Sequence, residues 1–138
     1  MSSTKPNIRP LDEVTAEVKK ISAEWQPPID DDIFPLIVAL RMHHFKTESS
    51  QGLRANGDGN IPLHRMPRVD IAMESGMRRL ITLVRSAQTV SQWALMPIPR
   101  QKGRAPWIRL ILLHDIPASC KTIRAETRRF AEQLQQIK

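Results

Sequence analysis

The sequence predicts an α+β domain in which a small antiparallel or mixed sheet of about three strands packs against three to four helices. Three observations predict this class. Apolar residues recur at helical spacing near both ends of the chain, two apolar segments at 92–98 and 107–113 suit a hairpin, and 138 residues suffice for one core without disulfides. We expect a flexible tail over residues 1–9 and a single domain over residues 10–138.

Two helices are expected in the first third of the chain. The first begins at Pro10, whose fixed φ suits a first turn, and ends before Pro27. Its apolar positions are spaced three or four apart: Leu11, Val14, Val18, Ile21 and Trp25. The second runs from about Ile33 to His44, is capped by one of the aspartates at 30–32, and is apolar enough to be the most buried element. A β-strand is the alternative for this short apolar segment.

The middle of the chain is expected to contain a loop, a strand and a helix. Residues 47–66 are polar and rich in turn-forming residues, which predicts a long loop. Residues 68–73 alternate between polar and apolar, as is typical of a half-buried strand. Ser75 is the expected cap of a third helix. The apolar face of this helix is formed by Met77, Leu80, Ile81, Val84 and Ala87.

Two strands and a helix complete the predicted domain. Pro97 lacks an amide donor and therefore places the strand at 92–98 on an edge of the sheet. The strand at 107–113 is apolar on both faces apart from Arg109. We expect this guanidinium to pair with Asp70 on a neighbouring strand, with an anionic ligand as the alternative. The last helix has its apolar stripe at Ile123, Thr127, Phe130, Leu134 and Ile137.

The net charge of +7 is unevenly distributed along the chain. Residues 1–63 carry seven basic and nine acidic side chains, residues 64–110 nine basic and two acidic, and residues 111–138 five basic and three acidic. The middle segment therefore carries a net charge equal to that of the whole protein. Such an excess bears on partners rather than on fold, and it favours a phosphate backbone or an acidic protein as the partner.

Eight basic side chains are the candidate residues for binding nucleic acid or another anion. They lie on the exposed faces of the third and last helices and in the turn between the last two strands, near Trp93 and Trp107. They are Arg78, Arg85, Arg100, Lys102, Arg104, Lys121, Arg124 and Arg128. The alternative is that these charges only keep the helix faces soluble, since no RRM, KH, zinc-finger or double-stranded-RNA-binding signature accompanies them.

The sequence contains no motif for catalysis or for a cofactor. The potential metal ligands are His43, His44, His64, His114 and Cys120, and their spacing is not that of paired zinc ligands. Glycine-rich nucleotide-binding motifs and the motifs of serine hydrolases and zinc proteases are absent. We therefore expect no metal and no cofactor. A small enzyme built on the histidines and Arg109 is kept as an alternative.

The segment from Asp32 to Ile71 resembles a family of uncharacterised bacterial proteins. In that family a similar apolar helix precedes a Ser-Cys-Glu-Gly-His box and a strand reading Pro-Trp-Val-Asp-Ile. The corresponding residues here are Ser49-Ser50-Gln51-Gly52-Leu53 and Pro67-Arg68-Val69-Asp70-Ile71, and the last helix is similar at Arg129-Phe130-Ala131-Glu132-Gln133-Leu134. The resemblance implies a similar architecture. It also implies that the chemistry of the box is lost, because Ser50, Gln51 and Leu53 stand where the family has Cys, Glu and His.

These observations predict a non-enzymatic, bacterial, cytoplasmic accessory protein whose basic surface contacts nucleic acid or an acidic protein. A single cysteine suits a reducing compartment, and the longest apolar run, residues 33–40, is too short to span a bilayer. The N-terminus has no signal-peptide core. The first alternative is a protein–protein interaction module or homo-oligomer that pairs the apolar stripes of the terminal helices.

Overall fold

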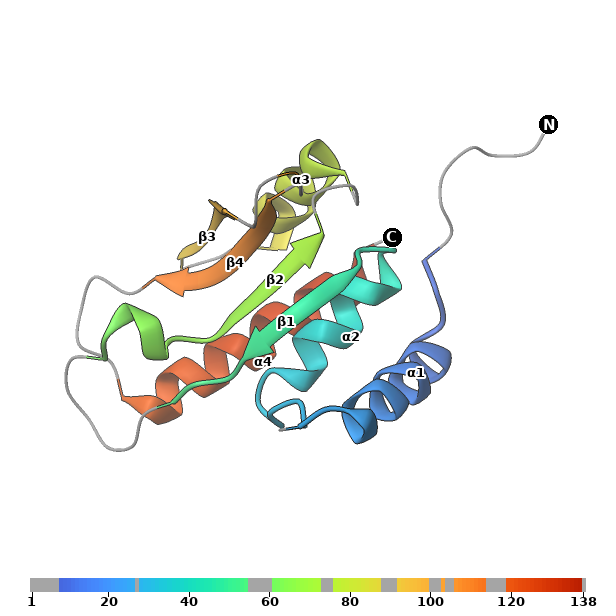
Figure 1. Cartoon of the computed structure of the whole chain (residues 1–138), viewed down its shortest axis with the longest axis horizontal. Coiled ribbons are helices and arrows are strands. Elements are labelled where there is room, and N and C mark those ends of the chain that lie inside the picture. The colour runs from blue at the N-terminus through green and yellow to red at the C-terminus, as the bar shows by residue number, and fades with distance from the viewer. Residues whose placement is uncertain are drawn as a thin grey trace.

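In the computed structural model, the described residues form four α-helices and four β-strands (Figure 1). The structure describes residues 8–26, 28–54, 61–72, 76–87, 92–99, 103, 106–113 and 119–137. The helices are α1 (Leu11–Glu24), α2 (Phe34–Met42), α3 (Met77–Ala87) and α4 (Cys120–Gln136). The strands are β1 (Thr47–Gln51), β2 (Arg68–Ala72), β3 (Gln92–Ile98) and β4 (Trp107–Leu113), and a single 3₁₀ turn, η1, spans Leu63–Arg65. The expected cap Ser75 lies outside the described residues.

The four strands form one antiparallel sheet in the order β1-β2-β4-β3. The predicted α+β class is confirmed, but the sheet has four strands rather than about three. The prediction of a long loop over residues 47–66 is wrong, because β1 lies within that segment. Its sequence, TESSQ, has no apolar alternation, and backbone pairing with β2 rather than burial of a face makes it a strand. The prediction that β3 is an edge strand is confirmed.

The core lies between the sheet and the helices α2 and α4, which pack on each other behind β1 and β2 in Figure 1. Alternate residues of β4, Ile108 and Leu110 among them, point into this core and are at most 2% exposed. Trp93 of β3 stacks on Phe130 of α4 with ring centroids 4.5 Å apart. The helix α2 is buried over most of its length, as predicted.

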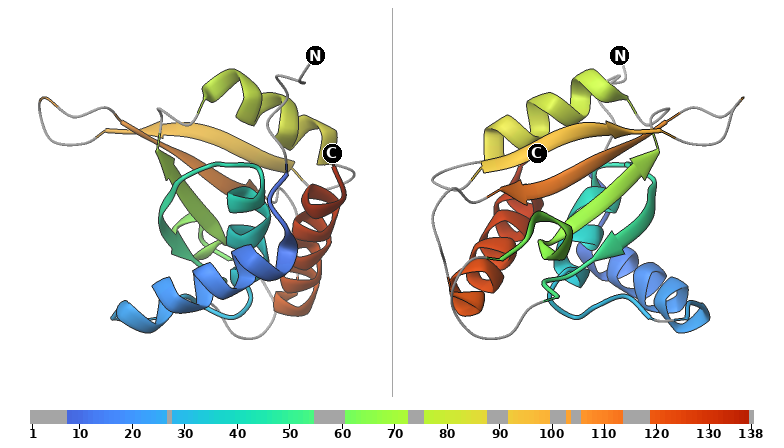
Figure 2. Two further views of the ribbon diagram at one scale, coloured as in Figure 1. Left: turned by 90° about the vertical axis from the view of Figure 1, so that its right-hand side faces the viewer. Right: turned by 60° about the vertical axis from the view of Figure 1, so that its left-hand side comes forward.

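The two terminal helices use their apolar stripes differently. On α4 the stripe residues Ile123, Thr127, Phe130 and Leu134 are all buried within the chain. On α1, which packs on α2, Val14 and Val18 are buried, whereas Leu11 is 45% exposed. The α4 stripe therefore belongs to the core of the domain. Figure 2 shows that α3 lies along β3, whereas α1 lies at the opposite side of the molecule.

Two aspartates hold the end of β1 against the segment that leads into α2. The prediction that an aspartate caps α2 is wrong, because the N-cap residue is Ile33 and no side chain caps the helix. Instead the carboxylate of Asp30 accepts a hydrogen bond from the amide of Gly52, and that of Asp32 accepts one from Leu53, each at 2.9 Å. We call these four residues the aspartate clamp. The clamp provides hydrogen-bond acceptors for the backbone amides of Gly52 and Leu53, which lie beyond the last residue pair of β1 and β2.

Candidate nucleic-acid interface

The described acidic side chains near the N-terminus form their ion pairs outside the basic middle segment. Those pairs are Arg9–Glu13, Arg9–Glu17, Arg41–Glu17, Lys46–Glu48, Arg54–Asp30 and Arg124–Asp32. Among the described residues of the segment 64–110, the one ion pair is Arg109–Asp70. The fold therefore does not use the acidic N-terminal third to neutralise the basic middle third, and the charge asymmetry of the sequence persists in the structure.

The outer face of α3, formed by Arg78, Thr82, Arg85 and Ser86, is exposed and contains no acidic residue. Arg78 and Arg85 lie about 10 Å apart along the helix axis, since they are separated by two turns. Within the part of the chain that the structure describes, neither forms an ion pair. The hydroxyls of Thr82 and Ser86 donate to helix carbonyls at 3.1 and 2.9 Å, so the two guanidinium groups dominate the chemistry of this face.

The inner side of α3 is anchored by Arg79. One guanidinium nitrogen of Arg79 donates a hydrogen bond to the carbonyl oxygen of His43, and the guanidinium carbon lies 4.0 Å from the centroid of the Phe45 ring. Leu80, Leu83 and other apolar residues of the helix are buried in the core. This anchoring fixes the orientation of the helix and directs its outer face to solvent.

The predicted basic residues of α4 lie in a different electrostatic environment. Lys121, Arg124 and Arg128 are exposed near the start of the helix, and Arg124 Nε lies 3.8 Å from a carboxylate oxygen of Asp32. Arg124 and Arg128 line a cavity of about 430 Å³ together with the three aspartates at 30–32. These aspartates offset the positive charge of α4. The other predicted residues, Arg100, Lys102 and Arg104, lie outside the described residues.

The predicted pairing of Arg109 with Asp70 is confirmed. Arg109 Nε lies 2.7 Å from one carboxylate oxygen of Asp70, and Nη2 lies 3.1 Å from the other. These hydrogen bonds raise the pKa of Arg109 above its ordinary value. Arg68, two residues from Asp70 on β2, has its pKa lowered by burial and by the charge of Arg109. Among the described residues Arg68 has no ion pair.

Arg68 was not among the sequence predictions for the site, whereas Trp107 was named only as a nearby aromatic residue and Arg109 only as an alternative binder of an anionic ligand. The sequence did indicate that Arg68 and Asp70 lie on the same face of the sheet. Side chains alternate between the two faces along a strand, and these residues are two positions apart on β2. The expected Arg109–Asp70 pair implied that β2 and β4 are neighbours, and their register places Trp107 on that face as well.

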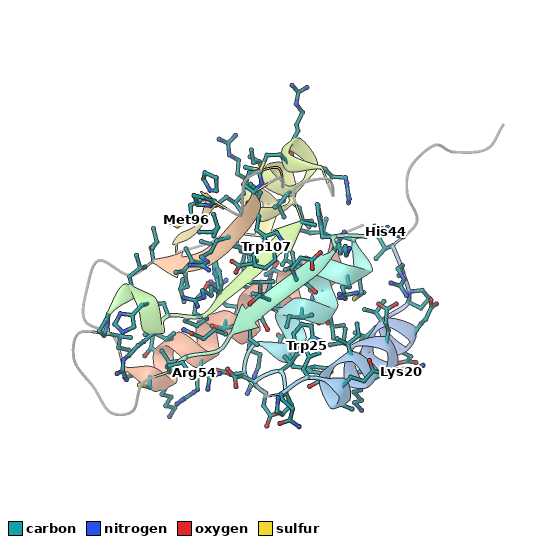
Figure 3. All side chains as sticks on the ribbon, viewed as in Figure 1. Lys20, Trp25, His44, Arg54, Met96 and Trp107 are labelled. Carbon is teal, nitrogen blue, oxygen red and sulfur yellow. The ribbon has the colours of Figure 1, made fainter. Side chains whose placement is uncertain are left out.

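The described histidines do not meet in one site. His43 is buried, and its Nε2 lies 2.6 Å from the carbonyl oxygen of Leu134. His44 is exposed on the side of the molecule away from Trp107 (Figure 3), and His64 lies on the exposed turn η1. His114 is outside the described residues. No group of three or more side chains suited to holding a metal ion occurs among the residues that the structure covers.

Burial of His43 makes stability dependent on pH. Burial lowers the pKa of His43 below 6.5, assisted by the nearby charge of Arg79 and opposed by the hydrogen bond to Leu134. The unfolded chain therefore binds a proton more readily than the folded chain. We expect the free energy of unfolding to fall as the pH decreases from about 7 to about 5. Urea denaturation at each pH measures this slope.

Two variants assign the slope to His43. His43→Gln keeps an amide donor for the Leu134 carbonyl but does not titrate, so it should flatten the pH dependence in this interval. His64→Gln, at an exposed position, should leave the slope as it is in the original chain. An unchanged slope in His43→Gln would show that another group is responsible.

Comparison of the chain with protein-family models, curated proteins and solved structures finds no significant match. The resemblance across residues 32–71 therefore stays a prediction from the residues themselves. Among the described helices, none combines the length and the apolar character that crossing a bilayer requires.

Ser49-Ser50-Gln51-Gly52-Leu53 spans the end of β1 and the two residues that follow it. Ser49 and Ser50 line a cavity of about 460 Å³ whose wall also includes Trp25 and Arg54. Residue 52 must be a glycine because the carboxylate of Asp32 lies very close to its backbone. A Cβ atom built at Gly52 would lie 1.9 Å from a carboxylate oxygen of Asp32. Gly52 therefore has a structural role in the aspartate clamp.

Proposed function

We propose that the protein is a non-enzymatic accessory protein that binds nucleic acid through its basic middle segment, with the outer face of α3 as a principal contact. The observation that carries this proposal is the pair of exposed guanidinium groups of Arg78 and Arg85, for which the described part of the chain provides no acidic partner. Guanidinium groups bind phosphate oxygens through charge-assisted hydrogen bonds, and each contact releases counterions from the nucleic acid.

The α3 face fits this role better than the basic face of α4. Lys121, Arg124 and Arg128 carry as much positive charge, but the aspartates at 30–32 line the same cavity and would repel a phosphate backbone. The α3 face has no such neighbours on its own helix, and Arg79 links the helix to His43 and Phe45.

Neutralising the α3 face should weaken binding and reduce its dependence on salt. For the double variant Arg78→Gln/Arg85→Gln we expect the slope of log affinity against log salt concentration to become less steep by roughly two, one unit for each lost phosphate contact. Fluorescence anisotropy with labelled single-stranded and duplex oligonucleotides over a salt series measures this. The matched control is Lys19→Gln/Lys20→Gln, which removes the same charge from the exposed face of α1.

Comparison of the two double variants distinguishes an effect of net charge from an effect of where the charges lie. Equal changes in both double variants would mean that net charge alone matters and would remove α3 from the interface. Absence of binding to every nucleic acid at low salt, or an affinity that salt does not change, would overturn the proposal. Salt-dependent binding to polyglutamate without binding to nucleic acid would instead identify an acidic protein as the partner.

A further inference from the structure

The face of the sheet that points away from α2 and α4 combines an indole with guanidinium groups. Ile108 and Leu110 point into the core, so Trp107 and Arg109 project from the opposite face of β4. The strand register places Ala72 of β2 and Ile98 of β3 on either side of Trp107. The indole is therefore flanked by an alanine and an aliphatic side chain and is half-buried between them.

The next row across the same face carries the charges. Asp70 of β2 and Met96 of β3 lie on either side of Arg109. Asp70 engages Arg109 through two hydrogen bonds, so the carboxylate is already used. Arg68 is diagonal to Arg109, because its partner in the ladder is Ile111. Its guanidinium is half-buried and has no ion pair among the residues that the structure describes, which leaves this face with an excess of positive charge.

No described helix covers this face, and its exposure is greatest at Arg68, Trp107, Arg109 and the β3 residues, since Asp70, Ala72 and Ile111 on the same face are at most 3% exposed. In Figure 1 α2 and α4 lie behind the sheet and α1 lies beside α2, beyond the β1 edge, while Figure 2 shows α3 along β3. The turn η1 lies at one end of the face. Figure 3, drawn in the same orientation as Figure 1, shows Trp107 over the middle of the sheet and Met96 beyond β4. We call the surface formed by Arg68, Asp70, Met96, Trp107 and Arg109 the open face.

We infer that the open face binds single-stranded nucleic acid, with an unpaired base stacked on Trp107 and a phosphate held by Arg68. The inference rests on the proposed function and narrows its substrate class. A base stacks on an aromatic ring only when it has left a duplex, and a single strand lying on a sheet places bases and phosphates within reach of neighbouring strands. A protein could also pack a side chain on the indole, but every nucleotide pairs a planar base with a phosphate, and this combination fits an indole beside a guanidinium.

The stacking role is tested by changing the ring while keeping the charge. For Trp107→Leu we expect the affinity for a short oligothymidylate to fall by roughly tenfold, whereas Trp107→Phe, which keeps an aromatic face, should lose at most about threefold. Arg68→Gln should weaken the same complex and make its salt dependence less steep by about one unit. Trp25→Leu, which removes a half-buried indole from the cavity beside Ser49 and Ser50, is the matched control and should bind like the original chain.

Cross-linking of the unaltered chain tests the inference without relying on variants, which could fail to fold. Irradiation of the complex with an oligonucleotide containing 5-iodouracil, followed by mass spectrometry of the peptides, should place the cross-link on the peptide that contains Trp107. Cross-links confined to α3, together with unchanged affinities of Trp107→Leu and Arg68→Gln, would overturn the inference and leave the proposed function intact. Absence of any salt-dependent complex would overturn both.

Discussion

Asp70→Ala should lower the free energy of unfolding by about 3–5 kcal/mol, because it leaves a partly buried guanidinium without its partner. The side chain of Asp70 is 4% exposed and that of Arg109 is 22% exposed, so solvent replaces little of what the carboxylate provides. The cost is increased by Arg68, whose charge already lies close enough to Arg109 to lower the pKa of Arg68. Without Asp70 the two guanidinium groups would repel each other across the open face.

Urea denaturation at neutral pH measures the loss, and a double variant separates the charge effect from packing. In Asp70→Leu/Arg109→Leu no charge of the pair is left uncompensated, so we expect this variant to be more stable than Asp70→Ala. Glu13→Ala removes a carboxylate from a different, exposed ion pair and serves as a control for the loss of one anion. If Asp70→Ala lost less than about 1 kcal/mol, the pair would be no stronger than an ordinary exposed ion pair.

The parts of the fold that the sequence predicts well are those in which burial follows a local pattern. The stripe of α4 repeats at three- and four-residue intervals, and the structure buries its first four members. Arg109 is conspicuous because it interrupts an apolar strand, and a guanidinium in such a position requires a carboxylate. Asp70 was the suitable residue on a neighbouring strand, and the register places the two directly opposite each other.

The parts that the sequence does not reveal depend on pairing between distant segments. The strand β1 is polar and becomes a strand because β2 offers it a backbone partner about twenty residues further along the chain. The aspartates at 30–32 have the composition of a helix cap, yet Asp30 and Asp32 bind the amides of Gly52 and Leu53. A local rule for capping cannot anticipate a competing donor that tertiary structure brings into reach.

The same reasoning applies to the candidate site. Arg78 and Arg85 are recognisable from the sequence because they lie opposite the apolar face of their own helix. Arg124 is equally recognisable as a basic residue, but its neighbour Asp32 is more than ninety residues away in the chain. The open face is harder still to predict, since its excess charge arises from which strands pair and which face the helices leave uncovered. Charge counts identify the basic segment, and only the fold shows which charges are offset.

Disturbing the aspartate clamp should also destabilise the fold strongly. Gly52→Ala should lower the free energy of unfolding by about 2–4 kcal/mol. A Cβ atom at residue 52 would lie 1.9 Å from one carboxylate oxygen of Asp32 and 2.8 Å from the other, distances at which the side chain must move. Asp32 has little freedom to do so, because its carboxylate accepts the amide hydrogen of Leu53 and lies beside Arg124. The substitution therefore combines steric overlap with loss of a hydrogen bond to a charged acceptor.

A double-mutant cycle distinguishes this clash from a general requirement for glycine at residue 52. Asp32→Ala removes every carboxylate atom that the new Cβ would meet. In that background Gly52→Ala should cost less than about 1 kcal/mol, so the two substitutions should show a coupling energy of roughly 1–3 kcal/mol in urea denaturation. Additive costs would mean that Gly52 is needed for its backbone conformation rather than for the approach of Asp32. A coupled result would show that glycine is required at residue 52 because the carboxylate of Asp32 approaches it so closely.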